Sequence, residues 1–267
     1  MMDSVIIGRE ANITSTSDLV TGLVSIGAYS LEKSIGNTDY TVAIGYKTLQ
    51  GQHNSEPQGV FIGGFAGMAA SSSYNSVMIG RSAGQYAGVS NAAEGQTFVG
   101  FHSGLYATGS YNTFIGKSAG KGGTTSAPYS SGENNTAVGY QALDGFTTGG
   151  NNTAVGNLTA TNLTTGDHNT AIGNQAAPAL TTGARNVAIG SAALQSEDSY
   201  GYNTAVGFGA LAALNANANG YNTAIGYQSG NGITTGIQNT GLGADATFDV
   251  DANNQTAIGY GATTDSA

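Results

Sequence analysis

The pentapeptide NTAVG at 152–156 decides the fold, because close copies of it recur along the whole chain. The same letters stand at 135–139 and 203–207, and variants include NTAIG at 169–173 and NVAIG at 186–190. Self-similarity at a nearly fixed period is the sequence signature of repeat architectures. The pentapeptide therefore predicts a structural repeat, not a catalytic motif.

Each copy ends in a glycine, and these glycines divide the chain into fifteen units that run end to end. Their spacing is mostly 16–19 residues, with longer steps of 20 from Gly80 to Gly100 and 23 from Gly116 to Gly139. We expect a single repeat domain over residues 1–267, with its longest insertion at 117–135. The closing glycines are Gly8, Gly27, Gly45, Gly63, Gly80, Gly100, Gly116, Gly139, Gly156, Gly173, Gly190, Gly207, Gly226, Gly243 and Gly259.

Composition and period together favour an all-β chain. Glycine makes up 43 of 267 residues and charged residues only 9%, whereas helices disfavour glycine and need charged outer faces. The interval between pentapeptides is too short for a helical crossover. The chain is therefore predicted to be a parallel β-solenoid or β-roll of about fifteen short coils, stacked at the strand spacing of about 4.8 Å.

Side-chain alternation along a strand assigns each pentapeptide position to a face. The residue before the glycine is always aliphatic and the third before it is always Val or Thr, so we predict that both columns point inward. The residue two before the glycine then faces outward, and an exposed apolar stripe usually marks an interface. We expect a homotrimer whose axis is lined by Phe61, Met78, Phe98, Phe114, Ala137, Ala154, Ala171 and Ala188.

Asparagine occupies the position four before the glycine in eight successive units. Stacked identical amides can pass hydrogen bonds from one strand to the next. We predict an asparagine ladder formed by Asn112, Asn135, Asn152, Asn169, Asn186, Asn203, Asn222 and Asn239.

Two repeat forms resemble known fibre proteins. NSVMIG at 75–80 and NVAIG at 186–190 are similar to the repeats of YadA-type heads of trimeric autotransporter adhesins, and NNTAVGYQAL at 134–143 resembles repeats of bacteriophage tail fibres. The resemblance implies a trimeric, non-enzymatic fibre segment on a virion surface that contacts a host glycan or protein. The alternative is the head of a bacterial surface adhesin that binds host or matrix ligands.

No catalytic, cofactor or metal site is predicted. IGKSAGKGG at 115–123 fails the phosphate-loop pattern, because the pattern requires a glycine five residues before Gly116, where Tyr111 stands. His53, His102 and His168 lie several coils apart, and the acidic segment at 245–254 lacks the glycine and closing glutamate of an EF-hand.

Other functions are less favoured. A net charge of −9 with only seven Lys and Arg disfavours nucleic acid as a partner, and no segment is apolar enough to insert into a membrane. Polysaccharide cleavage needs paired carboxylates, and Glu197 with Asp198 is the one adjacent pair. Ice binding favours flat threonine arrays, but the Thr column is predicted to face inward.

Recognition of a receptor is assigned to tyrosines beside the strands and to the longest insertion. Tyrosine offers rigid amphipathic contact area, and binding residues tend to lie on loops over a rigid scaffold; packing along the coils is the alternative for these tyrosines. The candidates are Lys117, Lys121, Tyr129, Glu133, Tyr140, Tyr200, Tyr202, Tyr221 and Tyr227.

Overall fold

The computed structural model describes residues 4–11, 22–32, 39–51, 58–70, 73–89, 93–126, 129–251 and 253–264. Over these residues the chain is an all-β parallel solenoid in which no helix is present. Contacts group the chain into two compact units, residues 1–135 and 136–267, and each is described by itself. That the whole chain is one repeat domain stays a prediction.

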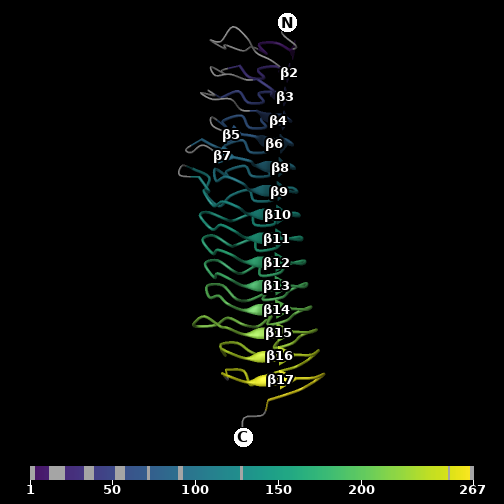
Figure 1. Cartoon of the computed structure of the whole chain (residues 1–267), viewed down its shortest axis with the longest axis vertical. Helices are drawn as coiled ribbons and strands as arrows, with labels where there is room; N and C mark the ends of the chain where they lie inside the picture. The colour runs from purple at the N-terminus through teal and green to yellow at the C-terminus, as the bar shows by residue number, and fades with distance from the viewer. Residues whose placement is uncertain are drawn as a thin grey trace. The chain divides into compact units, whose positions relative to one another are not determined.

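Unit 1 contains a parallel sheet in which every strand pairs with the next coil (Figure 1). A separate two-stranded pairing joins β5 (Ser73–Tyr74) to β7 (Ala93–Glu94). The sheet strands, in order, are β1 (Val5–Ile7), β2 (Val24–Ile26), β3 (Val42–Ile44), β4 (Gly59–Ile62), β6 (Ser76–Ile79), β8 (Thr97–Val99) and β9 (Thr113–Ile115).

Unit 2 repeats this arrangement with a more regular period. Its strands are β10 (Thr136–Val138), β11 (Thr153–Val155), β12 (Thr170–Ile172), β13 (Val187–Ile189), β14 (Thr204–Val206), β15 (Thr223–Ile225), β16 (Thr240–Leu242) and β17 (Thr256–Ile258). The parallel solenoid predicted from the repeat is confirmed. The described residues contain fifteen sheet strands, one at each pentapeptide, and the solenoid that they form has about 13 turns, against the fifteen coils expected.

The closing glycine is required by the close approach of successive coils. The strands pair in exact register, so that Ala137 lies beside Ala154, and the glycines that follow them also stack. Gly156 has φ of +140°, and a Cβ there would collide with the carbonyl oxygen of Gly173. Only glycine combines this backbone conformation with the absence of a side chain.

The two faces of the strand are the reverse of those predicted. The middle residue of each three-residue strand from β2 onward is buried, as are Phe61 in β4 and Met78 in β6, while the residues on either side are half-buried or exposed. The side chains expected on a trimer axis therefore lie inside the coil, and that assignment was wrong. They are Phe61, Met78, Phe98, Phe114, Ala137, Ala154, Ala171 and Ala188, each no more than 2% exposed.

Volume complementarity inside the coil explains the reversal. The interior is narrow, so a large residue in the middle of a strand needs a small one opposite it. Phe98 and Phe114 stack with ring centroids 5.1 Å apart, and a Cβ at Gly104 or Gly120 would strike these rings. Where unit 2 places Ala137 in the strand, the same facing position is filled by a buried leucine, Leu143. Close packing of this kind is typical of protein interiors.

Buried asparagine amides stand directly before strands β9 to β16 and connect successive coils. The backbone N–H of Asn169 donates to Oδ1 of Asn152 over 2.9 Å, and Nδ2 of Asn169 donates to the same oxygen over 3.1 Å. Nδ2 of Asn169 also donates to the carbonyl oxygen of Gly183 over 2.9 Å. Each amide thus links its neighbouring coils on both sides and satisfies backbone groups that would otherwise be buried without partners.

Replacing one amide of the ladder tests this role. Asn186→Ala removes the acceptor of the Asn203 N–H (3.0 Å) and the donor to the Tyr200 carbonyl (3.1 Å). Because each unsatisfied buried group costs about 1–3 kcal/mol, we expect a loss of about 2–4 kcal/mol in the free energy of unfolding, measured by chemical denaturation. The control Asn157→Ala, which removes an exposed amide pair with Asn174, should change it by less than about 0.5 kcal/mol. Equal effects would contradict the role of the ladder.

Candidate functional site

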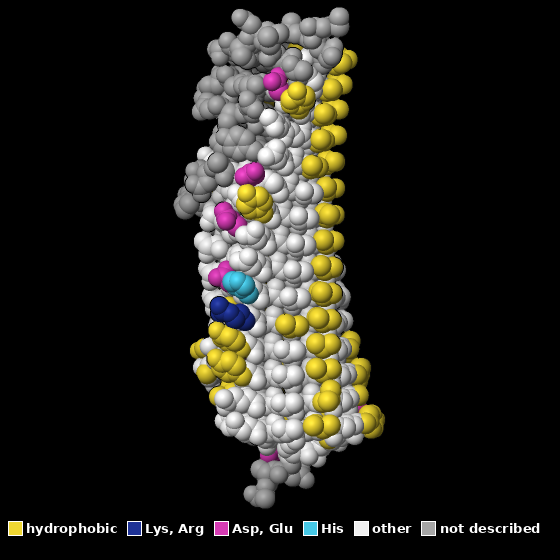
Figure 2. Space-filling model, viewed as in Figure 1, with side chains coloured by type: hydrophobic (Ala, Val, Ile, Leu, Met, Phe, Trp, Pro, Cys, Tyr) yellow, Lys and Arg dark blue, Asp and Glu magenta, His cyan; other side chains and the backbone are white. Residues whose placement is uncertain are grey.

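The candidate site is the outer strand face together with its two edges. On this face the residue before each closing glycine is aliphatic; Ile115 is 41% exposed in unit 1 and Ile225 is 40% exposed in unit 2. Figure 2 shows hydrophobic side chains gathered in a column along this side of each unit. The Val or Thr column beside it is at least partly exposed as well. Both columns were predicted to lie in the core. In the structure they instead form an apolar outer face.

Two edges border this face. The glycine edge consists of the two residues that follow each closing glycine, and it contains the receptor candidates Lys117, Tyr140 and Tyr227. The asparagine edge consists of the residue just before the ladder position, and it contains the candidates Tyr202 and Tyr221. The predicted tyrosines therefore lie on opposite sides of the strand face and do not form one cluster.

Aromatic pairs stabilise the edges of unit 2. The rings of Tyr202 and Tyr221 stack at 4.9 Å, and those of Phe208 and Tyr227 stack at 5.5 Å. Arg185 lies 5.5 Å from the ring of Tyr202 and donates from Nη1 to its hydroxyl over 3.1 Å. The remaining candidate, Tyr200, forms two hydrogen bonds through its backbone. Its carbonyl oxygen accepts from Nδ2 of Asn186, and its N–H donates to Oε1 of Glu197. Packing along the coils accounts for these rings, while roughly half of the Tyr227 surface stays exposed.

The insertion at 117–135 contributes one aromatic cluster that the sequence interpretation saw only in part. Tyr129 stacks on Tyr86 and Tyr106 with centroid distances of 5.4 and 5.8 Å, and those two rings stack on each other at 5.4 Å. Tyr86 and Tyr106 occupy the same position in consecutive coils, six residues after the closing glycine, which is the signal that could have identified them. Residues 127 and 128 lie outside the described residues.

Of the other candidates of this insertion, Lys121 adjoins the cluster, since its backbone carbonyl accepts from the N–H of Tyr106 over 2.8 Å. Lys117 is on the glycine edge. Glu133 is exposed on the asparagine side. There the hydrogen bond of Tyr111 to Glu94, with the charges of Glu94 and Glu133, raises the pKa of the Tyr111 phenol.

Metal-ligating residues do not gather within the described part of the chain, where no group of three or more His, Asp or Glu could hold an ion. His53 lies outside the described residues. The hydroxyl groups of Thr234 and Thr235 each donate to Oδ1 of Asp251 over 2.8 Å. These two hydrogen bonds lower the pKa of the Asp251 carboxyl. The described residues also contain no helix long and apolar enough to cross a membrane.

Glu197 is a carboxyl group inside the coil. It occupies the core position that Leu180 and Leu214 hold in the neighbouring coils, and all three side chains are fully buried. Its two oxygens accept the N–H groups of Tyr200 (2.9 Å) and Ala216 (3.1 Å). Burial raises the pKa of this carboxyl, against the opposing effect of the N–H donors. Because Glu197 points into the core, it does not pair with Asp198 across a surface groove.

This pKa shift predicts a pH dependence of stability. A carboxyl whose pKa is higher in the folded than in the unfolded chain contributes stability below the unfolded pKa, and that contribution is lost as the pH rises through the folded pKa. Glu197 should therefore lower the thermal unfolding temperature as the pH rises above the ordinary glutamate pKa of about 4.3. Glu197→Gln should flatten this dependence while lowering stability overall, because its amide can accept only one of the two N–H groups. Glu133→Gln serves as the exposed control, and an unchanged slope in Glu197→Gln would refute the assignment.

Comparisons with protein-family models, with curated proteins and with solved structures give no match to this chain.

Proposed function

We propose that the protein is a non-enzymatic fibre segment that assembles as a homotrimer on a virion surface and contacts a glycan or protein of the host surface. The observation that supports it best is the apolar outer strand face. Every described coil of unit 2 leaves an aliphatic side chain on this face, and such contiguous apolar surface is typical of protein interfaces.

Self-association follows from the regularity of this face. Every copy of the chain presents the same periodic columns, so three copies around a common axis can pack them together with matching spacing. The interface residues in this proposal are the outward aliphatic and Val or Thr columns, in place of the interior residues first assigned to the axis. The repeat resemblance to trimeric fibre heads and tail fibres agrees with this arrangement.

Contact with a host surface is assigned to the two edges, because association through the strand face leaves them at the periphery. They hold the exposed aromatic and polar side chains, among them Tyr140 and Tyr227. A stack of rigid coils presents such groups at a fixed interval, which suits a ligand that is itself repetitive.

The assembly is tested by measuring the native mass of the full chain with light scattering. We expect three times the monomer mass for the natural sequence and a monomer for Ile172→Asp/Ile189→Asp, because two carboxylates on each copy would be buried without partners at the axis. The control Thr148→Asp/Thr165→Asp adds the same charge at two exposed positions away from the strand face and should remain trimeric. A monomeric natural chain, or equal dissociation of both variants, would overturn the proposal.

A second candidate function rests on the threonine column of unit 2. Thr136, Thr153 and Thr170 lie in register on the outer face, so the argument that placed them inward, and thereby disfavoured ice binding, no longer holds. A trimer would cover this column, so the two functions compete for one face. Ice binding is tested by thermal hysteresis and ice recrystallisation assays on the natural chain. We expect activity only if the protein is monomeric. A monomeric protein without activity in these assays would exclude ice binding.

A further inference from the structure

The glycine edge of unit 1 carries an alternation of cations and aromatic rings. Cations follow the strands of every second coil, β1, β3, β6 and β9, and the intervening coils after β2, β4 and β8 carry rings. We call this set the cation–aromatic row: Arg9, Tyr29, Tyr46, Lys47, Phe65, Arg81, Phe101, His102 and Lys117. Of these residues, sequence reasoning had selected Lys117 alone as a binding candidate.

Backbone hydrogen bonds hold the row in register. The N–H of each second residue donates to the carbonyl of the first residue one coil earlier, as His102 does to Arg81 (3.1 Å) and Ser118 does to Phe101 (2.9 Å). Arg81, Phe101 and Lys117 therefore occupy the same corner in three consecutive coils. Since strands lie about 4.8 Å apart, cations on alternate coils recur at about 10 Å.

The rings position the cations on the surface. The Arg81 guanidinium lies 5.7 Å from the centroid of Phe101, and Lys47 Nζ lies 5.5 Å from Tyr46. Phe101 in turn stacks on His102 at 3.8 Å. Arg81 and Lys117 are exposed, and Phe101 is 36% exposed, so both charged groups and a ring face are presented to solvent.

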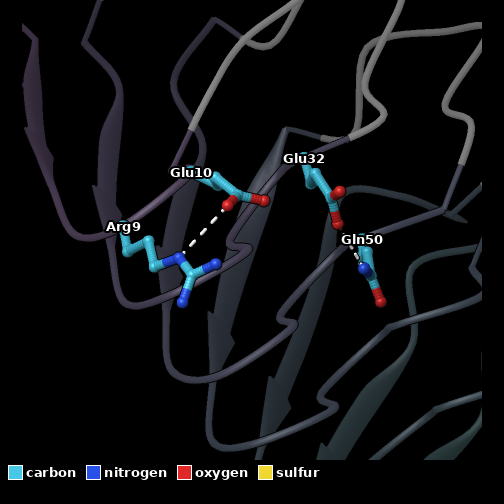
Figure 3. A network of polar contacts seen from close by, with 4 residues as sticks. All are labelled: Arg9, Glu10, Glu32 and Gln50. Carbon is cyan, nitrogen blue, oxygen red and sulfur yellow. Dashed lines mark hydrogen bonds and ion pairs between the residues drawn. The ribbon is translucent and has the colours of Figure 1, made fainter.

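The electrostatics of the row are positive over its β6 to β9 section. Burial, followed by the charges of Arg81, Lys121 and Lys117, lowers the pKa of His102, so three cations act on one imidazole. The single acidic residue in the row's positions is Glu10, which forms an exposed ion pair with Arg9 at 3.1 Å (Figure 3). Figure 3 also shows that the nearby carboxylate of Glu32 is engaged by Gln50 of the next coil.

Unit 2 provides an internal comparison. The two positions after the closing glycine of its eight strands hold Tyr140, Leu158, Phe208, Tyr227, Asp245 and Tyr260 among small and amide residues, and no Lys or Arg. The coil therefore forms without these cations. Four of the seven Lys and Arg in a chain of net charge −9 are nevertheless concentrated in the row. A local positive field of this kind attracts anionic ligands.

We propose that the cation–aromatic row binds a linear acidic polysaccharide that carries a carboxylate on every second sugar. A pyranose ring in an extended glycan advances by a length close to one coil spacing, so alternate rings coincide with the cations. The intervening uncharged sugars meet Phe101 and its counterparts, whose amphipathic rings offer an apolar face. This proposal rests on the proposed function as a host-contacting fibre, because it names the chemistry of the glycan.

Charge spacing favours a glycan over nucleic acid. Each strand of a DNA duplex carries a phosphate about every 3.4 Å along the helix axis, so about three charges per strand would fall within one interval between cations. The row would neutralise such a ligand poorly. A polymer with one charge per two sugars matches the cations one to one.

The experiment is isothermal titration of the full chain at low salt with oligosaccharides of hyaluronan, which alternate carboxylated and neutral sugars. Dextran, polygalacturonate and oligo-dT serve as neutral, denser acidic and phosphate comparisons. We expect binding of hyaluronan above the other three, and an affinity about tenfold lower in Arg81→Gln or Lys117→Gln, because each variant removes one charge-assisted hydrogen bond to a carboxylate.

Variants outside the row's own chemistry control for charge and aromatic area. Thr148→Asp lowers the net charge by one, as Arg81→Gln does, at an exposed position away from the strand face and both edges, and Phe101→Tyr keeps the aromatic ring. Both controls should leave the affinity unchanged, whereas Phe101→Ala should lower it. No binding of hyaluronan, equal losses in the controls, or equal binding of oligo-dT would overturn the proposal. Light scattering on the same sample separates this proposal from the proposed function. A trimeric mass without hyaluronan binding would overturn the glycan proposal and leave the proposal of a trimeric fibre standing.

Discussion

The close approach of successive coils at the closing glycine is the constraint on which the rest of the structure depends. At this point two backbones meet with no room for a side chain, and the glycine adopts a φ that other residues disfavour. Contact at one fixed point per coil sets the register of every strand. In-register stacking then places equivalent residues in columns, so each sequence position acts as a continuous line along its unit.

Each column solves a different physical problem. The asparagine column satisfies buried backbone groups between coils, and the interior columns share a narrow space in which a phenylalanine on one side is matched by a glycine on the other. The residues of the outer columns are only half-buried or exposed. This incomplete burial, not their hydrophobicity alone, supports the proposed assembly through this face.

Variation within a column is where specific function can arise. The architecture tolerates many residues at the glycine edge, as unit 2 demonstrates with tyrosine, phenylalanine, asparagine and serine. Unit 1 uses this freedom to alternate cations and rings, and the coil spacing converts a sequence pattern into a regular array of charges. Glu197 illustrates the opposite case: a carboxyl group in an interior column must be held by backbone N–H donors and remains sensitive to pH.

The sequence by itself determined the solenoid, the strand positions and the glycine that closes each of them, because these follow from the period and from alternation along a short strand. It did not determine which face points inward, since both faces of the pentapeptide are apolar and either could be core. Tertiary structure decided this through volume, pairing Phe98 with Gly104 and Ala137 with Leu143 across the interior. The compensation is visible in the sequence only once it is known that residues six apart face each other, because the return path of the coil brings them together. The cation–aromatic row has the same origin: its members lie 15 or more residues apart from coil to coil, and only the stacking of coils makes them neighbours.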